Sequence, residues 1–400
     1  MNVHRVTSEE SPAEGFETDS KTASMAAVKV VPAPNSRLLR RFAQLRQVLR
    51  DTTMRQAGAA SAPTNKKDPT RASIFFLHGE AHRSRRAAII RFFTPKAIAT
   101  RHMPVMERAA EALTAEFRAK GRGRLDELSL RLSAAVAAEI VGMTNSNIDA
   151  MARRIEGSSR ATQAAKGGIW VWIAKFMQAF YGLQVFYLDV KPAIAARRKE
   201  RQEDVISRLL DEGRSDQEIL VECMTFGLAG MTTTREFIVV AAWHLFDNKP
   251  LRQRFLDGDD GEKMAILMEI LRLEPVAGMI YRSIGEETQG LADEALPAGT
   301  RLSLHIRKAN LDEADVGPDP TRLDPDRAKR LKSNGAYMSF GDGEHFCPGW
   351  QVALGETRVF LDKLLRVPGI RLTKPPDMGW DPPMLQSYVL RNAIIECDRG

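Results

Sequence analysis

The side chain with the clearest chemical potential is Cys347, which lies in the glycine-rich stretch FGDGEHFCPG at residues 340–349. Pro348 suits the first turn of a helix, and residues 350–365 carry apolar side chains at helical spacing. A cysteine at a helix N-terminus faces unpaired N–H groups and the positive end of the helix dipole, and both favour the thiolate. The glycines allow the backbone to pass close to a flat or bulky group. The stretch therefore predicts a thiolate ligand in a tight loop, although most lone cysteines beside glycine are structural.

Two further polar groups, His82 and Arg86, lie four residues apart in a segment with a helical pattern at residues 79–93. This spacing puts both side chains on one face of a helix. Both can donate hydrogen bonds to anionic oxygens. The pair therefore indicates either a grip on carboxylates or an ordinary solvated basic face.

A long helix is predicted over residues 215–247, because Ser215 and Glu218 form a capping-box pattern at its start. Its middle, residues 229–236, contains Gly230 and three successive threonines, which are poor helix formers. Small residues let a bulky group lie against a helix, and threonine hydroxyls can bond to the i−4 carbonyl or turn towards a ligand. The irregularity predicts a functional face, and the alternative is a tolerated flaw in a long helix.

Another helix is expected at residues 262–273, where Glu269 and Arg272 lie three apart among apolar residues. A buried pair of this kind needs a further partner for its remaining donors and lone pairs. After Pro275 the pattern changes to short strands near residues 279–285, 296–304 and 389–395. Residues 310–339 are rich in Asp, Pro and Arg, which predicts a long, ordered, irregular loop leading to Cys347.

The composition is that of a globular protein: 400 residues, 44% hydrophobic and 27% charged. Three cysteines make no disulfide framework and no zinc site, and they fit a reducing cytoplasm. The net charge of +7 is expected to attract an acidic protein partner. Nucleic-acid binding is not expected, because no recognisable nucleic-acid module is present.

The N-terminal residues 1–35 have no apolar core typical of a signal peptide and predict a disordered tail before a single domain at residues 36–400. Residues 36–53 have a basic helical pattern. The most apolar stretch, residues 169–187, is about long enough to span a bilayer but is interrupted by Lys175 and by glutamines. We interpret it as buried or pocket-lining helices, with membrane contact as the less favoured alternative and no transmembrane anchor.

The motifs occur in the order His-x-x-x-Arg, Ala-Gly-x-x-Thr-Thr, Glu-x-x-Arg and Phe-x-x-Gly-x-His-x-Cys-x-Gly. That order and spacing resembles the cytochrome P450 family of the soluble bacterial type, from about Gly79 to the C-terminus. The resemblance implies a mainly α fold with small β-sheets. It also implies haem b between the long distal helix and the helix that follows the cysteine loop.

The resemblance implies roles for individual residues. Cys347 would be the axial thiolate ligand of the haem iron, which favours O–O cleavage. The residues implied to contact the haem besides Cys347 are His82, Arg86, Arg282 and His345 at the propionates, Phe340 and Gly349 in the cysteine loop, and Ala229. Arg327 would join Glu269 and Arg272 in a structural triad.

On the distal side, Ala229 and Gly230 would leave room for oxygen and substrate, and Thr233 matches the family threonine that helps to deliver protons. Two departures stand out. The family usually has an acid where this chain has Thr232, so protons would come through waters, Glu236 or the substrate. The usual helix and strand pair before the His82 helix is not recognisable, which predicts an abbreviated N-terminal region and a more open substrate entrance.

The function implied is a haem-thiolate monooxygenase that inserts one oxygen atom from O2 into an apolar small molecule, by hydroxylation or epoxidation. Electrons would come from NAD(P)H through a separate ferredoxin reductase and ferredoxin, and the enzyme would be a bacterial cytoplasmic monomer. The ferredoxin would dock on the basic residues Arg83, Arg85, Arg91, Arg327, Lys329 and Arg330. The substrate pocket would include residues 169–187 and 276–279.

Three alternatives remain open from the sequence. The first is a peroxide-driven or otherwise atypical P450 that catalyses coupling or isomerisation, which is suggested by Thr232. The second is a non-catalytic haem-binding or partner-recruiting protein. The third is a Cys–His hydrolase that uses Cys347 and His345, for which no third orienting group is apparent.

Overall fold

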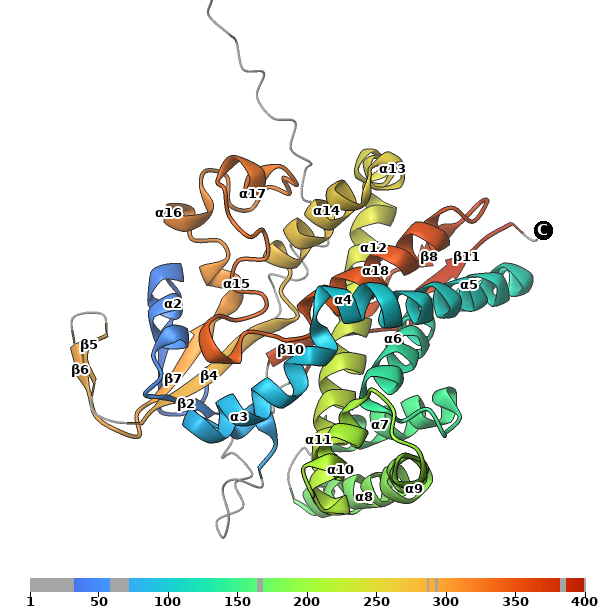
Figure 1. Ribbon diagram of the computed structural model, residues 1–400. Coiled ribbons are helices and arrows are strands. Elements are labelled where there is room, and N and C mark those ends of the chain that lie inside the picture. The colour runs from blue at the N-terminus through green and yellow to red at the C-terminus, as the bar shows by residue number, and fades with distance from the viewer. Residues whose placement is uncertain are drawn as a thin grey trace, which may run out of the picture.

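The computed structural model describes residues 32–57, 72–163, 168–285, 288–291, 294–381 and 386–398. The tail expected at residues 1–35 lies outside the described residues except for its last four. The described chain is mainly helical with small sheets, which confirms the predicted fold class (Figure 1). A large apolar core, to which Val239, Leu267 and Phe360 contribute, joins most of the helices.

The α-helices are α2 (Phe42–Arg50), α3 (Gly79–Ile90), α4 (Pro95–Ala97), α5 (Met103–Lys120), α6 (Leu125–Val141), α7 (Ile148–Gln163), α8 (Ile169–Val185), α9 (Lys191–Lys199), α10 (Val205–Asp211), α11 (Asp216–Gly227), α12 (Thr233–Asp247), α13 (Lys249–Asp257), α14 (Asp260–Leu273), α15 (Ile306–Ala309), α16 (Glu313–Val316), α17 (Arg327–Arg330) and α18 (Trp350–Leu365). Short 3₁₀ turns are η2 (Ile74–Phe76), η3 (Arg91–Phe93) and η7 (Gly343–His345). π-helical turns are η4 (Ile98–His102), η5 (Phe186–Val190) and η6 (Leu228–Thr232).

The main sheet has the strand order β1-β7-β4-β10-β9, with β2 also paired to β4. Its strands are β1 (Ser36–Leu39), β2 (Met54–Ala57), β4 (Ala277–Ile284), β7 (Arg301–His305), β9 (Asp377–Asp381) and β10 (Gln386–Arg391). Two smaller sheets contain β3 (Arg122–Arg124), β11 (Ile394–Glu396) and β8 (Arg371–Lys374), and β5 (Thr288–Leu291) with β6 (Glu294–Leu296). Arg282 lies inside β4, opposite Gln56 of β2 and Leu302 of β7, so the sheet fixes its backbone on both sides.

The expectation of an abbreviated N-terminal region without a helix and strand before α3 is wrong. The segment predicted as one helix at residues 36–53 is a strand, a helix and a turn, and a second strand follows. β1 pairs in parallel with β7, and β2 pairs antiparallel with β4. Each strand has four residues, too few for a period-two pattern to stand out, and each is stabilised by pairing with a strand more than 200 residues away in the sequence.

The long helix predicted over residues 215–247 is present as α11, η6 and α12, which follow one another without a break through the centre of the molecule (Figure 1). The predicted capping box is confirmed: the Ser215 hydroxyl accepts from Glu218 N, and the Glu218 carboxylate accepts from Ser215 N. The predicted irregularity is the π-turn η6, which includes Gly230 and Thr232. A π-turn widens a helix locally and is frequent at functional sites.

The predicted buried pair Glu269–Arg272 is confirmed, and it organises the loop before Cys347. Arg272 donates two hydrogen bonds to the Glu269 carboxylate, and Arg327 Nε donates a third at 3.2 Å. Both guanidinium groups also donate to loop carbonyls, among them Pro320 O from Arg272 and Val316 O from Arg327. The triad therefore ties several carbonyls of the irregular loop to α14.

The interpretation of residues 169–187 as buried or pocket-lining helices is wrong. They form α8 and the start of η5, which lie at the edge of the molecule beside α7 (Figure 1). Ala174 and Val185 are buried, but Trp172 is 73% exposed and Phe176 is 69% exposed. The helix is apolar on more than one face, and only one face can pack against α7. No helix in the described part of the chain combines the length and the apolar character that crossing a membrane requires.

Candidate active site

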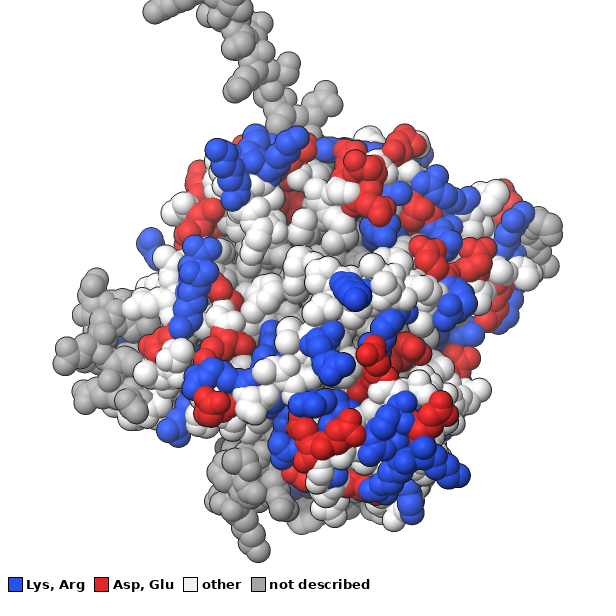
Figure 2. All heavy atoms as spheres, viewed as in Figure 1, with Lys and Arg blue, Asp and Glu red and all other residues white. Residues whose placement is uncertain are grey.

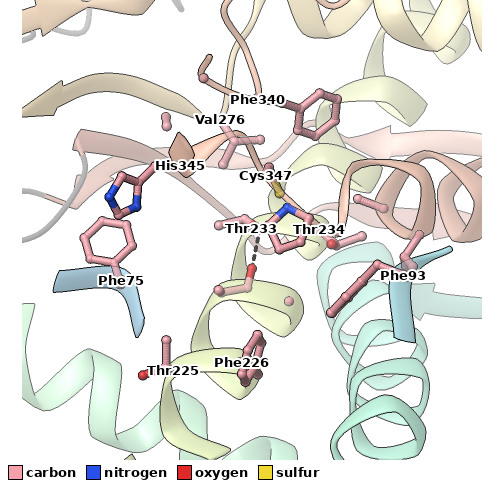
Figure 3. A pocket seen from close by; sticks show the side chains of 18 of the residues that line it. Phe75, Phe93, Thr225, Phe226, Thr233, Thr234, Val276, Phe340, His345 and Cys347 are labelled. Carbon is pink, nitrogen blue, oxygen red and sulfur yellow. Dashed lines mark hydrogen bonds between the residues drawn. The ribbon is translucent and has the colours of Figure 1, made fainter. Parts of the chain in front are cut away.

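A cavity of about 330 Å³ lies where α12, α18, α3 and β4 meet (Figure 3). Cys347 borders it from the loop before α18, and Thr233 borders it from α12. Aromatic side chains cover much of the remaining wall; in Figure 3, Phe93 and Phe226 lie below these two residues and Phe340 lies above. The cavity therefore joins one thiol to a largely apolar enclosure.

The loop that carries Cys347 is tightly constrained. Cys347 N donates to Phe340 O at 2.9 Å, and the rings of Phe340, Phe346 and Trp350 pack against one another. Gly343 has φ +67°, and a Cβ atom there would lie 2.0 Å from Leu49 O. Only glycine fits this position, because a side chain would meet the fixed backbone of α2.

The expectation that the helix N-terminus makes Cys347 a thiolate is incomplete. Burial raises the pKa of the Cys347 thiol, and the Gly349 N–H and the Arg86 charge only partly offset it. Desolvation disfavours the charged form of a buried thiol more than one N–H stabilises it. A bound metal ion would add positive charge and favour the thiolate.

Four basic side chains expected to act together do converge at one end of the cavity, which is lined by His82, Arg86, Arg282 and His345. The His82 and His345 rings lie 4.0 Å apart between centroids. Burial lowers the pKa of Arg282 to about 10, and burial with the nearby His82, Arg282 and Arg86 lowers the pKa of His345 to about 3. Burial is the largest cause of both pKa shifts, and the neighbouring basic groups add to the shift at His345.

No carboxylate in the described part of the chain forms an ion pair with Arg86 or Arg282. Arg86 donates to Phe346 O at 2.5 Å, and Arg282 donates to Tyr281 O at 2.9 Å. His82 Nδ1 is buried and has no hydrogen-bond partner among the described residues. Buried charges are costly unless they are paired. The cluster therefore fits a ligand with anionic groups at this end of the cavity.

The distal helix presents Ala229, Gly230, Thr233 and Thr234 to the cavity. The Thr233 hydroxyl donates to Ala229 O at 2.5 Å, and the Thr232 hydroxyl donates to Leu228 O at 2.6 Å. Both hydroxyls thus bind the carbonyl four residues earlier, as threonine commonly does inside a helix. Thr232 does not border the cavity, so a side chain there would act on it only through a neighbour.

Glu236 does not reach the cavity, and its expected role as a substitute proton source is wrong. Its buried carboxylate accepts from Arg235 at 2.8 Å, from Arg391 at 2.7 Å and from Leu390 N at 2.7 Å. Three donors hold it on the side of α12 that faces β10. It fixes the helix to the sheet and does not border the cavity.

Glu356, which the sequence reasoning missed, is the acidic residue that does border the cavity. Burial raises the pKa of its carboxyl to about 8, and a hydrogen bond with Thr234 opposes that effect. Its Oε2 atom has no partner among the described residues. The available signal was an acid early in the largely apolar helix that follows Cys347.

The structure agrees with only part of the expected pocket lining and with only part of the expected ferredoxin-binding surface. Val276 borders the cavity as expected, whereas residues 169–187 do not, and Phe75, Phe93 and Phe226 border it instead. Among the basic residues expected to bind a ferredoxin, Arg85 is buried against Glu222 at 2.5 Å, and Arg327 is buried in the triad. Those two residues cannot contribute to a docking surface.

Comparisons with known proteins agree with this geometry. The family profile described as Cytochrome P450 matches residues 264–374. Erythromycin C-12 hydroxylase of Saccharopolyspora erythraea is 29% identical over 334 residues, which cover 81% of this chain and 80% of the hydroxylase. Steroid C26-monooxygenase of Mycolicibacterium smegmatis is 31% identical over 206 residues, or 50% of this chain and 49% of that protein.

Solved structures share the fold at lower identity. P450BioI, in complex with an acyl carrier protein ligated to hexadec-9Z-enoic acid, has a TM-score of 0.76 at 18% identity and covers 95% of this chain and 98% of its own. CYP109E1 from Bacillus megaterium, in complex with corticosterone, has a TM-score of 0.73 at 20% identity and covers 94% and 97%. The chain belongs to the cytochrome P450 family, of the bacterial type, and is a monooxygenase of that family.

Proposed function

We propose that Cys347 is the axial thiolate ligand of a haem b that lies in the cavity between α12 and α18. The observation that carries this proposal is the Cys347 thiol in a cavity that is also lined by two arginines without carboxylate partners among the described residues and by two histidines, His82 and His345. A flat cofactor with two carboxylates fits that end of the cavity, and its metal ion would stabilise the thiolate. When bound, a haem with a thiolate ligand supplies the activation of O2.

The four basic side chains would orient the cofactor through its propionates. Arg86 and Arg282 would form charge-assisted hydrogen bonds, since a guanidinium group matches a carboxylate. His82 and His345 would donate from ring nitrogens, and anionic propionates would raise the pKa values that burial and the two arginines now lower. Binding of the cofactor would thus relieve the repulsion within the cluster.

Thr233 would handle protons on the distal side. Its hydroxyl now donates to Ala229 O, and it can exchange that bond for one to a water molecule beside the substrate. Glu356 extends from α18, on the cysteine side of the proposed haem, and would hold a neutral carboxylic acid next to Thr234 where the two helices meet. A neutral acid can release a proton when the site demands one, which the hydroxyl of Thr232 cannot do alone.

The substrate would be an apolar small molecule, because the wall away from the basic cluster is formed by Phe75, Phe93, Phe226, Ile140 and Val276. Such walls exclude water and hold a ligand mainly through apolar contact. Hydroxylation or epoxidation is the expected outcome, and the relatives named as a hydroxylase and a steroid monooxygenase support it.

Electrons would come from a separate acidic ferredoxin that docks on the cysteine side. Figure 2 shows Lys and Arg side chains over α3, the helix next to the cysteine loop. Among the residues expected to contribute, Arg83 and Arg91 are more than half exposed, and Lys329 and Arg330 are also exposed. Free cysteines and an acidic electron donor both fit a cytoplasmic enzyme.

Reduction kinetics test the electron donor. Replacing Arg83 and Arg91 by Gln should slow reduction by an acidic ferredoxin and weaken its salt dependence, and substrate affinity should not change. Replacement of the buried Arg85 is not a suitable control, because it would leave Glu222 unpaired. Replacement of exposed Arg122, which lies in β3 and not in the cysteine loop or α3, is a better control. Unchanged reduction in the double variant excludes this docking site.

A second candidate is a peroxide-driven P450, which the hydroxyl at Thr232 in place of an acid favours. Product formation with hydrogen peroxide alone should be compared with product formation with NADH, ferredoxin reductase and ferredoxin. The monooxygenase proposal predicts faster turnover with the electron-transfer proteins. Turnover with peroxide only would support the second candidate.

A further inference from the structure

The largest exposed apolar feature in the described part of the chain lies on α8 and η5, far from the cavity. The described part of the chain has eleven exposed large hydrophobic residues, and eight of them lie within residues 169–188. Six of them form one row, which we call the α8 seam: Ile169, Ile173, Phe176, Phe180, Leu183 and Tyr187. The row faces away from α7, against which Ala174 and Val185 of α8 are buried.

The spacing of the α8 seam is that of a helix that packs against another helix. Its successive members are four, three, four, three and four residues apart. This alternation is the heptad pattern of coiled-coil contacts. At 1.5 Å per residue the row is about 27 Å long. A straight apolar row of this length presents a surface for a second helix, and the described part of this chain supplies none.

The same spacing reads identically in both directions, because four-three-four-three-four is a palindrome centred on Gln178. Two copies of α8 that cross antiparallel at Gln178 would place Phe176 of one copy beside Phe180 of the other. Ile173 would meet Leu183, and Ile169 would meet Tyr187. A surface that matches itself after a two-fold rotation is what an isologous dimer requires.

The charges at the α8 seam are compatible with this pairing. Lys175 lies over the Trp172 ring and Lys191 lies over the Tyr187 ring, each 5.3 Å from the ring centre. Both lysines can keep their ammonium groups at the rim of a helix pair while their alkyl stems cover apolar area. The acidic residue of this segment, Asp189, is buried and paired with Arg154, so it places no charge in the α8 seam.

The exposed area also matches a dimer. The six residues are between 43% and 70% exposed, so with about 150–250 Å² per large apolar side chain they present about 600 Å². Trp172 and Leu188, which flank the row, bring the area to about 900 Å². Stable interfaces bury about 800 Å² per partner, whereas the largest apolar patch on a monomer is about 300–600 Å².

We propose that this protein forms a two-fold symmetric dimer through antiparallel packing of α8 against α8 of a second copy, centred on Gln178. The proposal replaces the monomer expected from the sequence and does not depend on the proposed chemistry. In Figure 1, α8 lies at the lower edge of the molecule and α2 at the left edge, so a dimer through α8 does not cover α2.

Light scattering coupled to size exclusion tests the assembly on the full-length, haem-loaded protein. The wild type should elute as a dimer at about 10 µM, the range expected for an interface of this size. Phe176→Glu should be monomeric, because it places two charges in the buried centre of the α8 seam. Leu331→Glu, at an exposed leucine on another surface, should remain a dimer. An unchanged haem spectrum in both variants shows that they fold. A monomeric wild type, or a dimeric Phe176→Glu variant, overturns the proposal.

Disulfide trapping tests the register. Ile173→Cys and Leu183→Cys proteins, mixed and mildly oxidised, should give a covalent heterodimer. Neither variant should cross-link to itself. In the antiparallel register, the cysteine introduced at position 173 of one copy and its equivalent in the other copy are ten residues apart along the helix axis, about 15 Å, and the same holds for position 183. The native cysteines do not interfere, since Cys223 and Cys397 are buried and Cys347 faces the cavity. Self-cross-linking of either single variant contradicts the antiparallel register.

Lipid vesicles test the competing occupant of the α8 seam. Flotation with neutral phosphatidylcholine vesicles and with vesicles containing phosphatidylglycerol should leave the wild-type dimer unbound, because the apolar row is already covered. Binding of a monomer to either vesicle, lost in Phe176→Glu, would show that α8 contacts a membrane surface and would overturn the dimer.

Discussion

Replacing Glu356 by Gln should change how stability depends on pH. Glu356 lies in α18, its side chain is buried beside the cavity, and burial raises the pKa of its carboxyl from 4.5 to about 8. The folded protein therefore holds this proton more tightly than the unfolded chain does. The stability that the protonated carboxyl contributes is complete below about pH 4.5 and is lost as the pH rises through 8. Glutamine has the same shape and cannot ionise, so the variant lacks this dependence.

The size of the effect follows from the two pKa values. With 1.36 kcal/mol per pKa unit, the wild type should lose about 2.5 kcal/mol of unfolding free energy between pH 5 and pH 7 through this group alone. By pH 9 the loss should reach about 4 kcal/mol, close to the limit set by the full shift. Relative to the wild type, Glu356→Gln should gain stability by the same amounts over the same ranges.

Urea unfolding at pH 5, 7 and 9, followed by circular dichroism on haem-loaded protein, measures the difference. Glu116→Gln is the matched control. Hydrogen bonds from Arg131 and Lys120 lower the pKa of Glu116 to about 2, so its carboxylate is ionised in the folded protein throughout this range. Its effect on stability should be nearly constant with pH. If the wild type and Glu356→Gln lose or gain stability in parallel from pH 5 to 9, Glu356 is not held neutral, and the argument from its burial fails.

Three further predictions concern the triad, the basic cluster and the distal helix. Arg327→Met should lower the free energy of unfolding in urea by about 3–5 kcal/mol, because it leaves a buried ion cluster short of one partner. The control Lys329→Met, at an exposed residue, should have little effect. Equal effects of the two substitutions would mean that the triad is not stabilising. Arg282→Leu should stabilise the haem-free protein, since it removes a buried unpaired charge, and should speed haem transfer to apomyoglobin; slower transfer would contradict the propionate role. Thr232→Asp should raise the product formed per NADH oxidised by supplying an acid one residue before Thr233, and an unchanged yield would mean that protons reach the site by another route.

The features that follow short-range rules could be predicted from the sequence. The capping box at Ser215, the helix that follows the cysteine loop (it begins at Trp350, two residues after the predicted Pro348) and the disturbed helix around Gly230 each depend on residues within one or two turns. The pair of Glu269 and Arg272 was recognisable because apolar neighbours surround it on the same helix. In each case the information lies within a few residues of the feature.

Features that depend on distant contacts could not be predicted. β1 and β2 are four residues each and exist because β7 and β4 pair with them. α8 was assigned to the interior because it is apolar, but the sequence does not reveal which faces find a partner in the same chain. Arg85 was expected at the surface because it is charged, and the sequence does not reveal that Glu222 of α11 pairs with it in the interior.

The acids near the cavity show the same limit. Glu236 lies only three residues from Thr233, yet Arg235, Arg391 and Leu390 N hold its carboxylate against β10, outside the cavity lining. Glu356 is far from Thr234 in the sequence, and the packing of α18 against α12 brings the two together. The phase of a helix and the identity of its neighbour decide which acid meets the cavity.

The central claim, that Cys347 binds a haem iron as a thiolate, is tested most directly by the absorbance spectrum of the reduced protein with carbon monoxide. The wild type should show the red-shifted Soret band that is typical of thiolate ligation. In Cys347→Ser, which retains the basic cluster and the cavity, haem should still bind and this band should be absent. Persistence of the thiolate band in Cys347→Ser, or its absence from haem-loaded wild type, would contradict the account.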